Sequence, residues 1–436
     1  MHPASISPDP RRQAAVILAR VEGRGAHAAR LLAEAPPFVR ELVLGTLRWQ
    51  GTVDTLLAPH LHTSIECLDA EVRSVLRLGV YEAKRLDTPV PVAVAEAVRV
   101  AKLLLPRAAG LVNAVLRRAA GESWPDPGDP SVPAERRLSH PAWLVARWRK
   151  LFGEARLEAT LLADQQPAPM TVLAAASNRE ELERSGCVLV AHPVVPGVLV
   201  VAEGSERVVR ALREGRAYAM DPTAVLVARL LPVGRGVVAD LAAAPGGKSL
   251  VLAWEGGGAR RLAADRNIGR VAMMRRTLGR TPEPPWVAAA DAARPPLRPG
   301  SCSGVLLDAP CSGTGTLRRH PEIRWRLRAA DLAGLAELQR RLAASAADLL
   351  APGGHLLYAT CSLEPEENGE VIASLGLESV PLAGALPAGT PAVELPSGGV
   401  AILPGATSDG FTVHLLRRPV DDRSARRLPA GMDRPK

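Results

Sequence analysis

The sequence is poor in cysteine, and the cysteines it has form no paired pattern. Five occur in 436 residues, an odd number, and no two are spaced as Cys-x-x-Cys. This excludes a disulfide framework and the usual structural zinc sites. A cysteine with a role in this chain therefore acts as a free thiol, and we expect no metal centre.

Long apolar runs and a targeting segment are also missing. Pro, Gly or Arg interrupts each apolar stretch before it reaches the ~20 residues that a membrane span requires. Residues 1–20 lack the basic-then-apolar order of a secretory signal. We therefore expect a cytoplasmic protein without a membrane partner.

Lysine is scarce, whereas arginine is abundant. Five lysines stand against 49 arginines (54 minus 5), and the formal net charge is +9. A basic excess of this size favours a polyanionic partner such as nucleic acid. Because lysine is so rare here, a lysine inside a motif is more informative than an arginine would be.

The length favours two or three domains, each with its own core. The composition and periodicity of the chain predict a division into an all-α bundle (1–123), a proline-rich linker (124–136), a small α+β domain (137–214), an α/β domain of the Rossmann-like type (215–418) and a charged, disordered tail (419–436). The expected fold is thus multidomain, with its α/β part at the carboxyl end.

The α/β domain is predicted from repeated strand, glycine-rich turn and helix patterns. Its strands are expected at 236–241, 261–264, 286–290, 304–307 and 354–359, and those of the α+β domain at 170–175, 187–191 and 198–202. Helical segments between most strands of the α/β domain predict a doubly wound, mostly parallel sheet. Ligands of such sheets bind at the carboxyl ends of the strands.

One tight turn follows the first of these strands. Asp240 ends the strand, and a helix begins near Ser249; the turn between them contains Ala242, Ala243, Ala244, Pro245, Gly246, Gly247 and Lys248. Such a turn lets a ligand approach the backbone and offers it helix amides. Gly-Lys-Ser also resembles the end of a nucleotide-binding P-loop, and Leu306-Leu307-Asp308 resembles its magnesium-holding strand. A P-loop, however, needs glycine five positions before Gly247, where Ala242 stands.

Two further carboxylates follow the next two predicted strands. Asp265 and Asp291 occur in that order after the glycine turn. A carboxylate at the first position can accept both hydroxyls of a ribose, and one at the second can reach an adenine amine. The sequence therefore predicts a site for an adenine nucleoside at this edge.

Two thiols are predicted to face the same crevice. Cys311 follows Asp308 on a Pro- and Gly-rich loop, and Cys361 ends another strand 50 positions later (361 minus 311). Both positions are polar turns at the ligand-binding edge of the sheet. Cys67, Cys187 and Cys302 are interpreted instead as buried small apolar residues.

These motifs resemble the RNA cytosine-C5 methyltransferases of the Sun/Fmu type, which act on small-subunit ribosomal RNA. The match lies in the segments 240–249 (Asp-Leu-Ala-Ala-Ala-Pro-Gly-Gly-Lys-Ser), 308–315 (Asp-Ala-Pro-Cys-Ser-Gly-Thr-Gly), 320–325 (His-Pro-Glu, then Trp325), 359–362 (Ala-Thr-Cys-Ser) and 409–413 (Asp-Gly-Phe-Thr-Val). Segments 41–49 and 110–118 resemble the NusB-like domain of that family. The chain departs from the family at Ala242, often cysteine, and at Leu173-Ala174-Ala175, where relatives usually carry Arg-Val-Asn.

The resemblance implies a function and a set of roles. It implies S-adenosylmethionine as cofactor, held by the turn and by Asp265, Asp291 and Asp308, and 16S ribosomal RNA as the partner of a monomeric enzyme. It also implies that Cys361 attacks cytosine C6, that Cys311 assists loss of the C5 proton or product release, and that Asp308 orients the base. Lys248 contacts either ligand, and the helical domain contributes RNA affinity. Two alternatives stay open from the residues alone: a noncatalytic RNA-binding protein and a P-loop NTPase.

Overall fold

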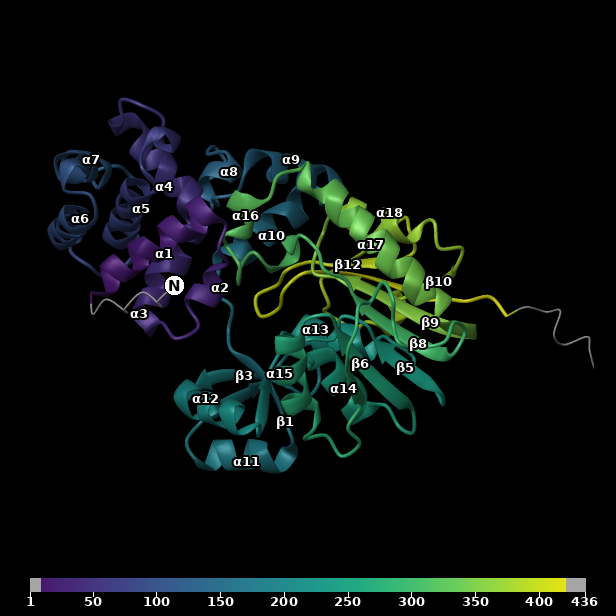
Figure 1. The fold of residues 1–436 in the computed structure, drawn as a ribbon. Coiled ribbons are helices and arrows are strands. Elements are labelled where there is room, and N and C mark those ends of the chain that lie inside the picture. The colour runs from purple at the N-terminus through teal and green to yellow at the C-terminus, as the bar shows by residue number, and fades with distance from the viewer. Residues whose placement is uncertain (1–8, 421–436) are drawn as a thin grey trace, which may run out of the picture. The chain divides into compact units, whose positions relative to one another are not determined.

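The computed structural model describes residues 9–420 (Figure 1), and they fall into two compact units. One unit comprises residues up to Ala168 together with Thr316–Ala329, and the other comprises Pro169–Gly315 and the chain from Ala330 onward. Residues 137–168, predicted to belong to the middle domain, thus fall in the first unit, and 316–329 leave the α/β part. The predicted tail lies almost wholly outside the described residues.

The first unit is helical. Its helices are α1 (Pro10–Arg24), α2 (Ala28–Leu31), α3 (Pro37–Arg48), α4 (Gln50–Leu57), α5 (Ala70–Arg85), α6 (Val90–Leu104), α7 (Ala109–Ala119), α8 (Ala134–Arg137), α9 (Ala142–Phe152), α10 (Glu154–Gln165) and α16 (Ile323–Arg326). Helix α5 packs against α1, α3, α4, α6 and α7, and its inward positions include Val72, Val75 and Leu76. The all-α prediction for this part is confirmed. Between residues 9 and 420, no helix combines the length and the apolar character that a membrane crossing needs.

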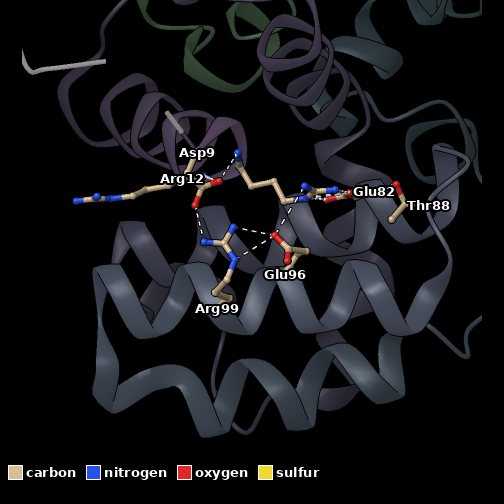
Figure 2. A network of polar contacts seen from close by, with 7 residues as sticks. Asp9, Arg12, Glu82, Thr88, Glu96 and Arg99 are labelled. Carbon is tan, nitrogen blue, oxygen red and sulfur yellow. Dashed lines mark hydrogen bonds and ion pairs between the residues drawn. The ribbon is translucent and has the colours of Figure 1, made fainter. Parts of the chain in front are cut away.

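A polar network joins α1 to α5 and α6 (Figure 2). Asp9 caps α1 by accepting the backbone N–H of Arg11, and Arg99 donates to the other Asp9 oxygen at 2.7 Å. The Arg11 guanidinium pairs with the buried Glu82 at 2.5 Å, and Arg99 pairs with Glu96 at 2.7 Å. Capping and pairing together fix the start of α1 against its two neighbours.

Residues 316–329 complete the helical unit, although they are separated from the rest of it in sequence. The Trp325 indole N–H donates to the Leu47 carbonyl at 2.7 Å, and the Glu322 carboxylate accepts the Ala28 backbone N–H at 3.2 Å. The sequence predicts this segment as part of the α/β domain, because it lies between strands of that domain. In the structure its polar side chains form hydrogen bonds to the backbone of the helical unit.

His140 of the helical unit should make folding sensitive to acid. Its ring is fully buried, and burial, together with the nearby Arg324 charge, lowers its pKa to about 4. Since the pKa in the folded state lies below the usual ~6.5, the unfolded chain binds the proton more readily. The contribution of neutral His140 to the free energy of unfolding is fully present above pH ~6.5. About 3 kcal/mol of it is lost as the pH falls toward 4. In His140→Asn, urea unfolding between pH 7 and 4 should show a shallower loss than wild type; parallel curves would contradict this.

The second unit contains a small antiparallel sheet. Its strands β1 (Thr171–Ala174), β2 (Val188–Ala191), β3 (Val198–Glu203) and β4 (Ala217–Ala219) lie in the order β2-β3-β1-β4, with α11 (Ala176–Arg184) and α12 (Ser205–Glu214). The three predicted strands are confirmed, while β4 is an addition. The departure at Leu173 falls on β1, where its side chain is buried.

The larger sheet has nine strands. They are β5 (Val237–Asp240), β6 (Arg260–Asp265), β7 (Trp286–Ala289), β8 (Cys302–Asp308), β9 (Leu350–Thr360), β10 (Glu378–Val380), β11 (Ala392–Glu394), β12 (Val400–Ile402) and β13 (Phe411–Arg417), in the order β11-β12-β13-β9-β8-β5-β6-β7 with β10 beside β13. Strands β5 to β9 pair in parallel, but β10 to β13 pair antiparallel. The five predicted strands thus pair in parallel, as expected, whereas the four antiparallel strands were not predicted; connections such as that between β12 and β13 are too short for a crossover.

Helices cover both faces of this sheet, as predicted. Helices α13 (Pro222–Arg229), α14 (Gly247–Glu255) and α15 (Ile268–Leu278) lie on one face, and α17 (Asp331–Asp348) and α18 (Gly369–Ile372) lie on the other. Figure 1 shows α17 running along β8 and β9. Leu306 of β8 packs toward α13, whereas its neighbours Val305 and Leu307 pack toward α17. Because β5, β6, β8 and β9 are parallel, their carboxyl ends meet at one edge.

Candidate active site

The predicted glycine turn between β5 and α14 is present. Gly246 has a φ of 108°, a backbone conformation that favours glycine. A Cβ added to Gly247 would come within 3.0 Å of the Tyr218 ring and 3.1 Å of the Met220 sulfur. Gly246 therefore suits its backbone conformation, and Gly247 allows the turn to lie against Tyr218 and Met220.

A pocket of about 160 Å³ lies against this turn. Its walls are Tyr218, Ala219, Met220, Ala224, Asp240, Ala242, Ala243, Ala244, Pro245, Gly247, Lys248 and Asp308. Typical small-molecule sites enclose ~300–1,000 Å³, so the pocket accommodates only part of a ligand of cofactor size. Among the predicted turn residues, only Gly246 does not line it.

Asp265 lies behind the turn and fastens it. Its carboxylate accepts the backbone N–H of Ala244 at 3.2 Å and that of Asn267 at 2.9 Å, and the side chain is almost completely buried. These bonds use one acceptor position on each oxygen and leave others for hydroxyl groups. Asp291 is exposed after β7, and it accepts the N–H of Ala293 at 2.9 Å. Both carboxylates lie at the predicted edge but outside the pocket.

Lys248 and Asp308 form an ion pair at the wall of the pocket. The ammonium lies 2.7 Å from the carboxylate and 5.0 Å from the centre of the Phe411 ring. Burial lowers the pKa of Lys248, but the charges of Asp308, Asp240 and Cys361 outweigh this and leave its pKa above the ordinary value. Lys248 is therefore a fixed positive charge in the site.

Asp240 is a buried acid beside this pair. Burial raises its pKa to about 7, although the Ser249 hydroxyl donates to it at 2.6 Å and Lys248 opposes the rise. The charge of Asp308 adds to the increase. Asp240 and Asp308 thus compete for the ammonium of Lys248, and Asp240 titrates near neutral pH.

The two predicted thiols meet at the ends of β8 and β9. The sulfurs of Cys311 and Cys361 are 3.3 Å apart, so the expectation of a shared crevice is confirmed. The hydrogen bond to Cys361, together with burial, raises the pKa of Cys311 well above that of a free thiol, and the charges of Glu367 and Asp308 add to this. Cys311 is therefore held in the neutral form in the free protein.

The remaining cysteines differ in their exposure. Cys187 and Cys302 are buried, as expected, but Cys67 is exposed. The prediction for Cys67 is wrong because it ends the short turn Ile65–Cys67, in which Ile65 takes the inward position.

Three site residues escaped prediction as contributors to the site. Tyr218 reaches the pocket from β4, Phe411 faces Lys248 from β13, and Glu367 lies behind both thiols. Phe411 lies in a motif that the sequence does display. Tyr218 and Glu367 carry no local signal, since strand pairing and loop packing place them.

The residues of the pocket suit S-adenosylmethionine better than a nucleoside triphosphate. Gly247 lines the pocket without a side chain, so the backbone of the turn forms that part of the wall. Carboxylates line the pocket, and they favour a ligand with positive sulfonium and ammonium groups. Lys248, which a P-loop would direct to phosphate, is paired with Asp308.

Comparisons with known proteins agree with this geometry. Residues 227–413 match the family model of the 16S rRNA methyltransferase RsmB/F, and residues 8–121 match the NusB family. The ribosomal RNA small subunit methyltransferase B of Thermus thermophilus is 36% identical over 94% of this chain and 98% of its own. That of Pseudomonas putida is 35% identical over 76% and 79%. The chain belongs to the RsmB/F family.

Family membership confirms the resemblance stated from the motifs. A solved structure, PH0851, covers 94% of this chain and 99% of its own with a TM-score of 0.75 and 24% identity, and so supports the fold. NSun6 from Pyrococcus horikoshii, solved with SFG, aligns at a TM-score of 0.53 and 18% identity over 64% of this chain and 99% of its own. As a member of the RsmB/F family, the chain is an S-adenosylmethionine-dependent RNA methyltransferase. The P-loop NTPase interpretation is thereby discarded.

Proposed function

We propose that this protein methylates C5 of a cytosine in 16S ribosomal RNA through a covalent cysteine adduct, and that it acts as a monomer. The observation that carries the proposal is the pair of thiols, 3.3 Å apart, beside a pocket that contains the Lys248–Asp308 ion pair. A methyltransferase acting on an oxygen or an exocyclic nitrogen has no use for two adjacent cysteines. Addition to the pyrimidine ring does need a sulfur nucleophile.

The cofactor binds along the edge of the parallel strands in this proposal. Asp308 and the turn residues Ala242, Ala243, Ala244, Pro245, Gly246, Gly247 and Lys248 hold its methionine end. Asp265 accepts the ribose hydroxyls, and Asp291 binds the adenine amine. The small pocket contains only the first group of contacts, which agrees with the two outer carboxylates lying beyond it.

The chemistry then follows from the two thiols. When bound, S-adenosylmethionine supplies an electrophilic methyl group. The Cys361 thiolate adds to C6, which turns C5 into an enamine-like carbon able to take that methyl group. Lys248 supplies a fixed positive charge to this part of the site, and the charge of Cys361 is one of the groups that raise the pKa of Lys248.

Release requires the C5 proton to leave before the S–C6 bond can break. Cys311 lies against Cys361 and assists this step. Cys311 first loses its thiol proton to water; the raised pKa makes the resulting thiolate a strong base, which takes the C5 proton and returns to the neutral thiol. Asp308 orients the base through N3 or the exocyclic amine.

The helical unit contributes RNA affinity rather than chemistry in this proposal. Its match to the NusB family spans residues 8–121, and the chain as a whole is basic. Phosphate contacts release counterions, so RNA binding should weaken steeply with salt. The domain limits 1–123, 124–136, 137–214 and 215–418 are predictions from the sequence, and the two compact units divide residues 137–168 and 316–329 differently.

Bisulfite sequencing tests the proposed function directly. Ribosomal RNA from cells with and without this gene should differ at a cytosine that resists conversion only when the gene is present. Purified protein with S-adenosylmethionine should restore that signal on unmodified small-subunit RNA. Identical bisulfite patterns in both strains would contradict the cytosine-C5 assignment, and binding of the RNA without methyl transfer would favour the noncatalytic alternative.

Asp265→Ala should weaken cofactor binding by about 10- to 100-fold. The substitution removes a charged acceptor of ribose hydroxyls, worth ~1.5–3 kcal/mol, and also frees the Ala244 amide that shapes the turn. Calorimetry with S-adenosylhomocysteine measures the effect. Asp265→Asn retains one acceptor oxygen and should lose less. Unchanged affinity in the alanine variant would exclude this carboxylate from the cofactor site.

A further inference from the structure

A single buried carboxylate connects the two cysteine loops. The side chain of Glu367 is fully buried. One of its oxygens accepts the backbone N–H of Ser312 at 2.8 Å, and the other accepts the hydroxyls of both Ser312 and Ser362. Ser312 follows Cys311 and Ser362 follows Cys361, so each loop is bound to the same group directly after its thiol.

Glu367 is itself held from the opposite side. The Gln339 side chain on α17 donates to Glu367 at 3.0 Å and to the carbonyl of Pro310 at 2.8 Å. The Tyr358 hydroxyl on β9 donates to the Glu367 carbonyl at 2.7 Å. The carboxylate is therefore anchored to rigid elements of the fold and cannot follow one loop away from the other.

The two serine hydroxyls are also neighbours. Their oxygens lie 3.0 Å apart, and the Ser362 hydroxyl accepts the backbone N–H of Glu364 at 3.1 Å. A network of this kind, closed around one charge, fixes the positions of its members more strictly than separate pairs would. The separation of the two sulfurs is thus set by contacts behind them.

We propose that Glu367 is a positioning residue that sets the spacing of Cys311 and Cys361 and distinguishes their environments. The inference rests on the proposed function, because the two thiols have to act on one base. It adds a residue that neither the motifs nor the family match assigns. The contacts that carry it are those from the carboxylate to the residue after each cysteine.

The charge of Glu367 has a second effect. It is one of the groups that raise the pKa of Cys311, so its removal should ease ionisation of that thiol. The spacing and the charge can be separated by substitution. Glu367→Gln keeps the length and loses the charge, whereas Glu367→Asp keeps the charge and is too short to reach both serines from its anchored backbone.

Alkylation of the free protein tests the inference without RNA. Full-length wild type, Glu367→Gln and Glu367→Asp are treated with iodoacetamide across a pH series, and peptide mass spectrometry follows Cys311 and Cys361 separately. Glu370→Gln is the matched control, since it removes an exposed carboxylate three positions further on. We expect the Cys311 midpoint to fall by about one pH unit or more in Glu367→Gln and to stay within the control range in Glu367→Asp.

Methylation kinetics then test the spacing. Both Glu367 variants should lose kcat by about a hundredfold, because small misplacements of reacting groups are costly. KM for RNA and S-adenosylhomocysteine affinity should match those of Glu370→Gln. A Cys311 profile unchanged in Glu367→Gln, or a normal kcat in both variants, would overturn the inference.

A milder variant is available if the Glu367 variants do not fold. Ser312→Ala removes one hydroxyl donor to the carboxylate and leaves the backbone bond in place. Alkylation of Cys311 should then accelerate while that of Cys361 stays unchanged; equal rates to wild type at both thiols would also overturn the inference. If alkylation shifts as expected but no RNA is methylated by wild type, the proposed function fails and the positioning role stands.

Discussion

Cys361→Ser should lose methylation by about 10⁴-fold or more, while S-adenosylhomocysteine still binds with the affinity of wild type. A serine hydroxyl stays protonated near neutral pH and is a far weaker nucleophile than a thiolate, and loss of a nucleophile typically costs this much. The substitution exchanges one atom in a half-buried position beside Cys311. No covalent complex with RNA should form, which denaturing electrophoresis of labelled RNA will show.

Cys311→Ser should behave in the opposite way. Cys361 can still add to C6, but loss of the C5 proton is impaired, and the S–C6 bond cannot break until that proton has left. We therefore expect a protein–RNA species that survives denaturing electrophoresis and that requires S-adenosylmethionine. Trapping in the Cys361 variant instead would reverse the two roles, and normal turnover in both variants would exclude the covalent mechanism.

The geometry favours this division between the thiols for a reason that the sequence does not contain. Both cysteines follow strands in similar polar turns, and their spacing along the chain ranks neither. In the structure, the hydrogen bond to Cys361 and burial raise the pKa of Cys311, and the charges of Glu367 and Asp308 add to this, whereas the charge of Cys361 helps to raise the pKa of Lys248. The difference arises from groups on three separate elements.

The central parallel strands, unlike the edge strand β7, were predictable because they are buried on both faces. Strands such as β5 and β8 are nearly continuous apolar runs bounded by glycine and aspartate, which is a local signal. The strands β10, β11 and β12 have three residues each, too few to display any period. β10 and β12 pair with β13, and β11 pairs with β12, so the antiparallel part of the sheet depends on contacts between segments and could not be predicted.

The same distinction applies to the site. The glycine turn, Asp265, Asp308 and the two cysteines each end a predictable strand, and parallel strands bring such ends together. Tyr218 and Glu367 reach the site through strand order and loop packing instead. In the segment 316–329 the composition even gives a wrong indication. Arginines are rarely buried, so an arginine-rich segment is expected to be exposed.

Arg324→Ala should destabilise the helical unit by ~3 kcal/mol or more, because it opens a cavity and deprives three carbonyls of a donor, each buried unsatisfied group costing ~1–3 kcal/mol. Arg324 is almost fully buried, and burial lowers its pKa to about 10, so it stays charged near neutral pH. Its guanidinium donates to the carbonyls of Arg48 at 3.2 Å, Ser139 at 2.9 Å and Asp164 at 3.3 Å. Alanine leaves a cavity and three carbonyls without this donor.

Hydrogen exchange localises the effect. Amides of α3, α9 and α10 should lose protection in Arg324→Ala, while Arg30→Ala, an exposed change in the same unit, should stay within ~0.5 kcal/mol of wild type. Arg324→Lys should restore little of the lost amide protection, since one ammonium cannot donate to three carbonyls as the planar guanidinium does. Unchanged protection in the alanine variant would mean that Trp325 and Glu322 suffice to hold 316–329.

The result also bears on any deletion of residues 1–125. Such a truncated chain lacks the Arg48 and Leu47 carbonyls that bind a segment beginning one residue after Gly315 of the Cys311 loop, so a loss of methylation there would not by itself measure RNA affinity.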